Sequence, residues 1–390
     1  MIDFTLSEKD QKILAAVKEE ALVCRKYARH FDDHEEEFAP AELPEAKDFK
    51  NPFALLAKRD ELDSSMGVMS MLVTAGQTWG DYTVRMRRGT GGLGNAALRA
   101  SGTPEQQSRW GSKTLAMAIT EPGCGSDSKA VQTTAALDGD EWVVNGEKIF
   151  VTTGCRAEGV VVWATISKAA GRAGIKSFIV MKGTPGFEVT HKEKKLGIRA
   201  DDTAAYVFRD CRIPRDHLLG GDESIPKEGA GGFKGVMKTF NMTRPAVAAI
   251  GLGIAQAALD FTRDALAGEG VDVDWNAGTH ARSAAQQELV EIEADIETAM
   301  LGVLHATWLS GESKPNNLEA SIAKAKGGEI ARTATQRCIA LLGSLGISLD
   351  YLLEKWFRDC RITDIYEGTG QIQRLIIARD ILGYSAAELS

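Results

Sequence analysis

EWVVNGEKIFVTTG, residues 141–154, is the stretch that indicates the type of fold most clearly. β-forming residues stand on both sides of the dipeptide Asn145–Gly146. Asn-Gly between such runs is the strongest short-range signal for a hairpin. We therefore predict that EWVV and KIFVTT are two strands joined by a tight turn at Asn145 and Gly146.

The chain around this stretch is rich in further short β-forming runs. These runs are LAMAIT (115–120), GVVVWATI (159–166), KSFIVM (176–181), FEVT (187–190) and AAYVF (204–208). The turn signal DGDE precedes WVV, since glycine and aspartate favour tight turns. Together these runs predict a compact β domain over residues 115–222.

Helical periodicity replaces this pattern on both sides of the β domain. Apolar residues recur at helical spacing near the N-terminus at Ile13, Leu14 and Val17, and later at Leu289, Ile292, Ile296 and Val303. Further helices are expected over residues 316–343 and 371–382. No β-α-β alternation is present, so the fold is predicted to be mainly α with a central β domain. The predicted domains are a helical domain (1–114), the β domain (115–222) and a second helical domain (223–390).

Composition excludes several classes of partner. The 46 lysine and arginine residues against 54 aspartate and glutamate residues give a net charge of −8, which disfavours nucleic acid. No uncharged apolar stretch reaches the roughly 18 residues of a membrane helix. The start, MIDFTLSEKDQKIL, lacks the pattern of a signal or transit peptide. We expect a cytoplasmic protein that binds neither membrane nor nucleic acid.

Several familiar motifs carry little weight here. GTGGLG, residues 89–94, satisfies G-x-G-x-x-G, but no strand precedes it and no β-α-β unit surrounds it, so a dinucleotide fold is not predicted. His30 and His34 share a helical spacing, but charged helix faces far outnumber metal sites, and no metal is predicted. The six cysteines contain no C-x-x-C pair and are expected to be reduced thiols.

Four segments hold candidate site residues. TEPGCGSD (120–127) combines hydroxyl groups and turn glycines, which suit either an anionic or polar ring system or an ordinary loop. Alternation in KIFVTTG places Phe150 and Thr152 on one face, as a platform for a planar cofactor or as plain strand residues. FNMTRP (240–245) puts an arginine amid an apolar helix.

The fourth segment is DIYEGTGQIQRLI, residues 364–376. Glu367 stands between Tyr366 and Gly368, just before an amphipathic helix. A partly desolvated glutamate in such a place suits a general base. An acid at a helix entry that only favours the helix dipole is the alternative for Glu367 alone.

Taken in order, TEPGCGSD, NGEKIFVTTG, GFKGVMKTFNMTRP and YEGTGQIQRLIIARDIL resemble the acyl-CoA dehydrogenase family. The resemblance runs from about Leu115 to the end of the chain. It implies an N-terminal helical domain, a central β-barrel or sandwich domain and a C-terminal four-helix bundle. It also implies FAD between the domains, a homo- or hetero-tetramer, and a role in fatty acid β-oxidation.

The resemblance carries over to individual residues. It implies FAD contacts from Ile119, Thr120, Ser126, Phe150, Thr152, Thr369 and Gln371. It implies acyl-CoA contacts from Ser126, Asn241, Arg244, Tyr366 and Gly368, with Glu367 as the catalytic base.

The reaction that the resemblance implies is α,β-dehydrogenation of an acyl-CoA thioester to a trans-2-enoyl-CoA. The α proton passes to Glu367 while hydride passes to flavin N5. The backbone N–H of Glu367 helps to stabilise the enolate oxygen. Burial should raise the pKa of Glu367 and make it a better base. Electrons then pass to an electron-transferring flavoprotein.

Three segments depart from the family pattern. GEGVDVDWNAGTHAR (268–282) stands where the family has R-x-x-F-G for the FAD pyrophosphate, with Arg282 as a candidate substitute. ALLGSLG (340–346) replaces Q-x-x-G-G-x-G, and the usual N-terminal P-E-x-x-G-G segment is not visible. These departures keep open a non-catalytic or half-site subunit of a heteromeric acyl-CoA dehydrogenase. A flavin monooxygenase of the same fold is a further alternative, against which Glu367 argues.

Overall fold

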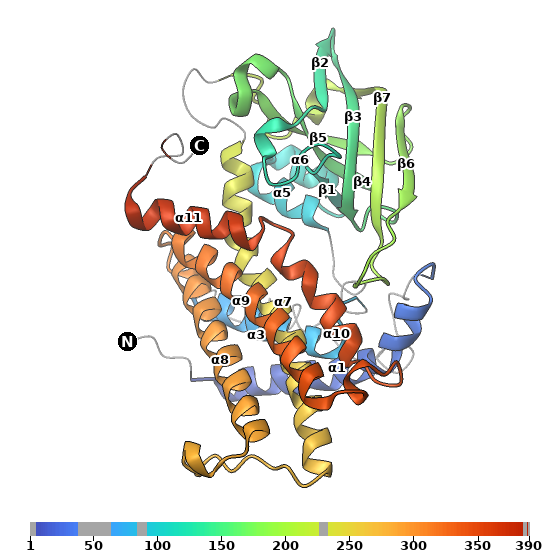
Figure 1. Ribbon diagram of the computed structural model, residues 1–390. Helices are drawn as coiled ribbons and strands as arrows, with labels where there is room; N and C mark the ends of the chain where they lie inside the picture. Colours follow the sequence, from blue (N-terminus) through green and yellow to red (C-terminus); the bar gives the residue numbers. More distant parts are fainter. Residues whose placement is uncertain (1–4, 38–63, 84–91, 226–232, 385–387, 389–390) are drawn as a thin grey trace. The chain divides into compact units, whose positions relative to one another are not determined.

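A computed structural model describes residues 5–37, 64–83, 92–225, 233–384 and 388. The chain forms two compact units, which we call the helical unit and the sheet unit. The helical unit comprises Met1–Arg88, Leu196–Ala200 and Asn241–Ser390, and the sheet unit comprises Gly89–Lys195 and Asp201–Phe240. The mainly helical fold with a central sheet is confirmed (Figure 1). The predicted division into three domains stays a prediction.

The sheet unit contains one curled seven-stranded sheet and two short helices, α5 (Leu93–Ser101) and α6 (Pro104–Trp110). The strands are β1 (Leu115–Ala118), β2 (Thr134–Asp138), β3 (Glu141–Thr152), β4 (Gly159–Thr165), β5 (Ile175–Met181), β6 (Phe187–Lys192) and β7 (Thr203–Pro214). Their order is β1-β4-β2-β3-β7-β6, with β5 paired to β4. All seven residues of β4 are buried, as expected for an inner strand that reads as a continuous apolar run.

The predicted hairpin at Asn145 and Gly146 is wrong. Strand β3 runs through both residues and pairs along its length with β7, with a register shift between Val144 and Gly146. The Asn145 side chain explains the difference, because its Oδ1 atom accepts a hydrogen bond from the backbone N–H of Asp210 on β7 at 2.7 Å. Asn-Gly here forms a bulge inside a strand pair. The DGDE turn is confirmed: Gly139 has a φ of 62° between β2 and β3.

The helical unit is built from seven helices in the described residues. They are α1 (Glu8–Asp33), α3 (Ser64–Gly80), α7 (Phe233–Gly268), α8 (Ala284–Gly311), α9 (Asn317–Leu342), α10 (Leu353–Cys360) and α11 (Gly370–Leu382), and α7 starts in the sheet unit. Helices α9 and α11 confirm the predicted helices within a residue of each predicted boundary. The predicted apolar stripe on α8 is fully buried in the core of the unit.

Helix α7 is the central helix of this core. Its Thr243–Gly268 segment is the one described segment that is long and apolar enough to cross a membrane by length and composition, and 78% of its apolar window is buried inside the protein. Small residues allow close packing, since a Cβ atom on Gly253 would lie 2.2 Å from the carbonyl oxygen of Ala75 on α3. Burial against neighbouring helices therefore accounts for the apolar composition of α7.

A buried cluster of charges ties the segment Leu196–Ala200 to α10 within the helical unit. Lys355 on α10 contacts Asp81 at 2.6 Å and Asp359 at 2.5 Å, and all three side chains are buried. Asp359 also accepts a hydrogen bond from the backbone N–H of Ile198. Burial alone lowers the pKa of Lys355, but the two carboxylates outweigh burial and raise it above its ordinary value. The cluster thus holds a permanently charged lysine.

Replacing Lys355 by methionine should destabilise the protein strongly. The Lys355→Met variant leaves two buried carboxylates without their cation, a change that costs about 3–5 kcal/mol of unfolding free energy. Urea denaturation of the variant and the parent protein measures the difference. Lys326→Met on the exposed face of α9 is the matched control and should change stability by less than about 0.5 kcal/mol. An unchanged midpoint for Lys355→Met would contradict the role given to this cluster.

Candidate active site

Glu367 occupies a strained turn immediately before α11. Its φ of 55° lies in the left-handed region, and Gly368 follows with a φ of 90°. The buried Gln373 amide holds both residues, since its Nε2 atom donates to the carbonyl oxygens of Glu367 at 3.2 Å and Gly368 at 3.1 Å. Thr369 caps α11 by accepting a hydrogen bond from Ile372 N–H. A left-handed non-glycine residue held in this way marks a candidate functional position.

The carboxyl group of Glu367 lies in a buried and positively charged environment. Its Oε2 atom is buried and has no hydrogen-bond partner among the described residues. Burial raises the pKa of Glu367, while a hydrogen bond with Thr243 and the charges of Lys324 and Arg244 oppose this rise. The net rise moves the pKa of Glu367 above that of an exposed glutamate, which makes its carboxylate a better proton acceptor.

Arg244 is a predicted residue, distant in sequence, whose charge acts on Glu367. It is buried on α7, and its Nη1 atom donates to Asn317 and Ser321 of α9, each at 3.4 Å. Burial lowers the pKa of Arg244 to about 10, and the charge of Glu367 opposes this shift. The guanidinium group stays charged at neutral pH and is anchored on α9 beside the glutamate.

Tyr366, Gln371 and Asn241 are the remaining predicted residues of the helical unit. The Tyr366 hydroxyl lies 3.3 Å from that of Tyr82. Gln371 is exposed in the first turn of α11. Asn241 lies on α7, but its side chain is outside the described part of the structure. The roles predicted for these residues stay predictions.

In the sheet unit, a buried ion pair that the sequence reasoning missed organises the TEPGCGSD loop. Lys148 of β3 is fully buried, and its Nζ atom lies 2.8 Å from Glu121 and 2.9 Å from the carbonyl oxygen of Ile119. Glu121 also accepts hydrogen bonds from Thr133 N–H and its hydroxyl. A lysine directly before the β-forming run IFVT was the available signal for this pair.

Phe150 is presented to solvent by a bulge of β3. The pairing of β3 with β7 shifts register between Lys148 and Val151. Between these residues, Phe150 has a φ of 57° and is 59% exposed. This bulge interrupts the alternation from which a common face with Thr152 was predicted. The backbone N–H of Ile149 donates to the carbonyl oxygen of Thr120 at 2.9 Å, which ties the bulge to the TEPGCGSD loop.

These residues of the sheet unit fit a flavin. The sheet unit supplies an exposed aromatic ring at Phe150, the exposed Ser126, and the partly exposed residues Thr120 and Thr152. A Cβ atom added to Gly123 would meet no described atom within 4 Å, so the TEPGCGSD loop is open at this residue. Such a set suits a planar ring with polar edges.

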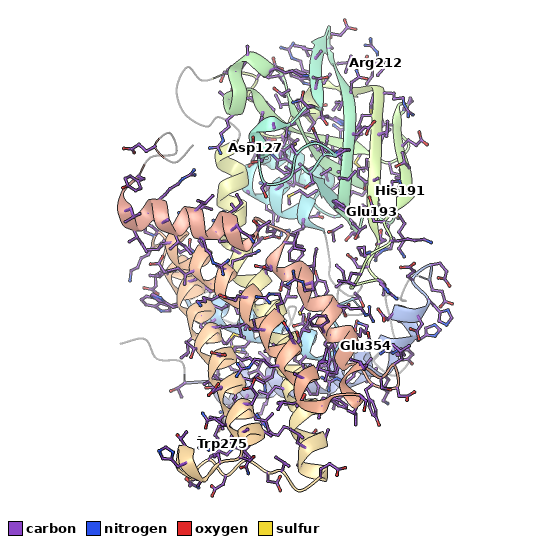
Figure 2. All side chains as sticks on the ribbon, in the orientation of Figure 1. Asp127, His191, Glu193, Arg212, Trp275 and Glu354 are labelled. Atoms are coloured by element: carbon purple, nitrogen blue, oxygen red, sulfur yellow. The ribbon has the colours of Figure 1, made fainter. Side chains whose placement is uncertain are left out.

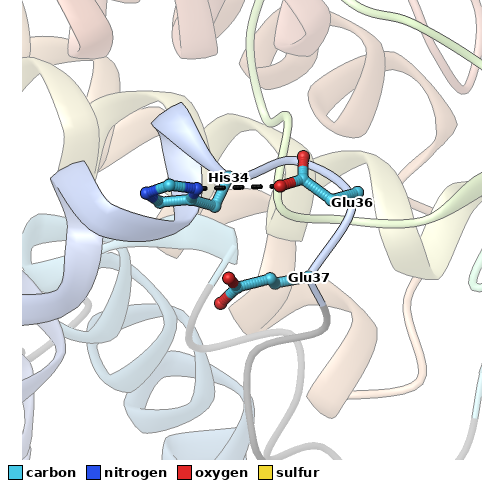
Figure 3. A group of neighbouring side chains, drawn as sticks. All are labelled: His34, Glu36 and Glu37. Atoms are coloured by element: carbon cyan, nitrogen blue, oxygen red, sulfur yellow. Dashed lines mark ion pairs between the residues drawn. The ribbon is translucent and has the colours of Figure 1, made fainter.

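A surface group near the end of α1 resembles a metal site only in composition. His34, Glu36 and Glu37 lie close together, as Figure 3 shows, but all three are exposed. His34 Nδ1 lies 3.6 Å from Glu36, and His30 Nε2 lies 2.9 Å from Glu37. These contacts account for the group as exposed ion pairs, and the prediction that the protein uses no metal stays a prediction.

The segment that departs from R-x-x-F-G is the exposed loop between α7 and α8. The Arg282 guanidinium donates to the carbonyl oxygen of Trp275 at 3.3 Å, and Trp275, labelled in Figure 2, is 52% exposed. ALLGSLG spans the end of α9, where Gly343 has a φ of 56°. An arginine is thus present in the loop, but at the opposite end from the family pattern.

Adding a side chain at Gly368 should disturb the Glu367 turn. In Gly368→Ala, the new Cβ atom would lie 2.5 Å from Gln373 Nε2 in a backbone conformation that favours glycine, so we expect a loss of about 1–3 kcal/mol. Gly302→Ala on α8 is the control, because the added Cβ meets no described atom within 4 Å. This substitution should stabilise the helix by up to about 1 kcal/mol. Thermal unfolding distinguishes them, and equal melting temperatures would argue against a constrained turn.

Known proteins match this architecture over nearly the whole chain. Residues 116–211 match the family model "Acyl-CoA dehydrogenase, middle domain", and residues 230–382 match "Acyl-CoA dehydrogenase, C-terminal domain". The short-chain specific acyl-CoA dehydrogenase, mitochondrial, of Bos taurus is 35% identical over 379 residues, covering 92% of this chain and 88% of that protein.

Solved structures agree. Butyryl-CoA dehydrogenase from Megasphaera elsdenii superimposes with a TM-score of 0.80 and 28% identity, covering 98% of this chain and 100% of that one. A chain from work on the electron transferring flavoprotein of Acidaminococcus fermentans gives a TM-score of 0.79 and 30% identity, with 98% and 100% covered. The sequence-based family prediction is confirmed: the chain belongs to the acyl-CoA dehydrogenase family of flavin-dependent oxidoreductases.

Proposed function

We propose that the protein catalyses FAD-dependent α,β-dehydrogenation of a short-chain acyl-CoA thioester to the trans-2-enoyl-CoA. The observation that carries this proposal is the buried carboxyl group of Glu367, held in a strained turn beside Arg244 and Lys324. Membership of the family supports the reaction, and relatives that are named short-chain specific support the substrate class.

Glu367 would act as the base that takes the proton from the α carbon. Burial disfavours its charged form, so the carboxylate has a greater tendency to accept a proton than an exposed glutamate has. The Gln373 amide fixes the backbone on both sides of the peptide that links Glu367 to Gly368. Such fixation keeps a catalytic group in one position before substrate binds. The backbone N–H of Glu367 would donate to the thioester oxygen as negative charge develops there.

The FAD contacts of the proposal are the residues that the family resemblance implies. Phe150, Thr120, Thr152, Ile119 and Ser126 would hold the ring from the sheet unit. Thr369 and Gln371 would contribute from the start of α11. When bound, FAD would supply the acceptor for the β hydride.

Substrate contacts would come mainly from the helical unit. Arg244, Tyr366, Gly368 and Asn241 are the proposed contacts there, together with Ser126 of the sheet unit. Because Arg244 is already bonded to α9, its position does not depend on the substrate.

The cellular setting is also part of the proposal. An electron-transferring flavoprotein would accept the electrons, a homo- or hetero-tetramer would be the working assembly, and fatty acid β-oxidation would be the process served. All six cysteines are free thiols, which supports a reducing compartment such as the cytoplasm.

A non-catalytic or half-site subunit of a heteromer is a second candidate. The departure from R-x-x-F-G in the loop of Trp275 and Arg282 favours it, because that element grips FAD in the family. A purified chain that stays colourless after FAD is added would support this second candidate.

Bleaching of the flavin colour by substrate tests the main proposal. A yellow protein should lose its visible absorbance when short acyl-CoAs are added without oxygen, and longer or branched acyl-CoAs should act more slowly. Glu367→Gln should slow bleaching at least about 100-fold, because general-base catalysis contributes a factor of that size. The variant should retain its flavin and its acyl-CoA binding, and bleaching at the parental rate would refute Glu367 as the base.

The pH dependence of kcat/KM gives an independent check. Glu367 accepts a proton only when it is ionised, so activity should fall as the pH drops through its pKa. Burial raises that pKa, and the acid limb should therefore have its midpoint above 4.5, the ordinary value for glutamate. A midpoint at or below 4.5 would show that another group controls the reaction.

A further inference from the structure

One face of helix α9 packs against the segment that leads into Glu367. Asn317, Ser321, Lys324 and Gly328 recur at helical spacing, so their side chains share this face. Asn317 and Ser321 bind the Arg244 guanidinium. At the other end, an added Cβ on Gly328 would lie 3.0 Å from Cα of Asp364. Lys324 therefore stands between Arg244 and the segment that leads into Glu367.

Lys324 is a buried cation with unusual surroundings. Its side chain is fully buried, and its Nζ atom has no hydrogen-bond partner among the described residues. The charged groups that face it are Asp364 before the turn, Glu367 in the turn and Arg244 on α7. Lys355 of the same unit, by contrast, bonds directly to two carboxylates. Within the described part of the chain, Lys324 makes no such direct contact with a carboxylate. Its role is therefore not to form an ion pair with Asp364.

The charge of Lys324 depends on pH in the range around pH 8. Burial lowers the pKa of Lys324 to about 8, the carboxylates of Asp364 and Glu367 oppose this shift, and Arg244 adds to it. The ammonium group is thus charged at pH 7 and loses its proton as the pH rises through 8. Arg244, whose pKa is about 10, keeps its charge over this range.

We propose that Lys324 is a positioning residue for Glu367, whose ammonium group keeps the glutamate carboxyl group ionised and ready to accept a proton. A cation close to a buried carboxyl group favours the charged form and opposes the effect of burial. Arg244 contributes in the same direction, but its guanidinium is anchored on Asn317 and Ser321. Lys324 is the cation whose removal leaves those hydrogen bonds in place.

Substitution of Lys324 tests this proposal without relying on turnover. Infrared difference spectra recorded against pH follow the carboxyl band of Glu367, which is identified by its loss in Glu367→Gln. In Lys324→Met the midpoint of this band should move upward by about one pH unit. Lys326→Met is the control, because Lys326 is exposed on α9 and pairs with Glu329 at 3.3 Å. Its midpoint should match that of the parent protein.

A second variant separates charge from hydrogen bonding. Lys324→Gln keeps a donor but removes the charge, so its midpoint should rise as in Lys324→Met. If Lys324→Gln restores the parental midpoint, a hydrogen bond rather than charge is responsible and the proposal fails. An unchanged midpoint in both variants, with parental thermal stability, would also overturn it. Should one variant fail to fold, the other carries the test.

The inference rests on the proposed function only in treating Glu367 as the base. The acid limb of kcat/KM should move by the same interval as the infrared midpoint in Lys324→Met. If the infrared midpoint moves but Glu367→Gln still turns over, the proposed function is wrong and the effect of Lys324 on Glu367 stands. If the infrared midpoint does not move, the inference is wrong whatever the activity.

Discussion

Burial of ionised side chains is the constraint on which this structure depends. Lys355 and Lys324 lie in the same helical unit, and burial alone lowers the pKa of both. Direct contacts with Asp81 and Asp359 raise the pKa of Lys355 again. At Lys324, only the charges of Asp364 and Glu367, which are not hydrogen-bonded to it, oppose the lowering of the pKa. Lys355 therefore stays charged, whereas the charge of Lys324 depends on pH. The difference arises from contacts, since both are buried to the same degree.

The two units use strained backbone in a similar way. Glu367 and Phe150 both have a left-handed φ, at 55° and 57°. A buried polar side chain supports each strained segment. Gln373 donates a hydrogen bond to the Glu367 turn. The ion pair of Lys148 and Glu121 holds the TEPGCGSD loop, which is bonded to the Phe150 bulge. Strain of this kind persists only where the surrounding structure holds it. The backbone at the candidate base is thus held by hydrogen bonds, and the backbone on either side of Phe150 is held by pairing with β7.

Sequence periodicity predicted α8 well because this helix has a buried apolar stripe, whereas the buried residues of α11 are only Gly370 and Gln373. The stripe on α8 contains Leu289 and Val303, and residues 316–343 correspond closely to α9. The Asn145 hairpin failed because a cross-strand bond to Asp210, far away in sequence, stabilises a bulge instead of a turn. Glu121 and Lys324 were missed for a related reason. Their importance depends on distant partners, whereas Glu367 and Arg244 were recognisable from local motifs.

The segment Leu196–Ala200 has a consequence for how the chain reaches its native state. The helical unit is assembled from three separate stretches, with the sheet unit inserted between them. During synthesis, α1 and α3 leave the ribosome long before α7, α8 and α10, which they and the inserted segment must pack against. Contacts of such long sequence separation form slowly. The faces of the early helices that pack against the C-terminal helices therefore stay exposed until those helices emerge, and exposed apolar surface of this kind favours aggregation during synthesis.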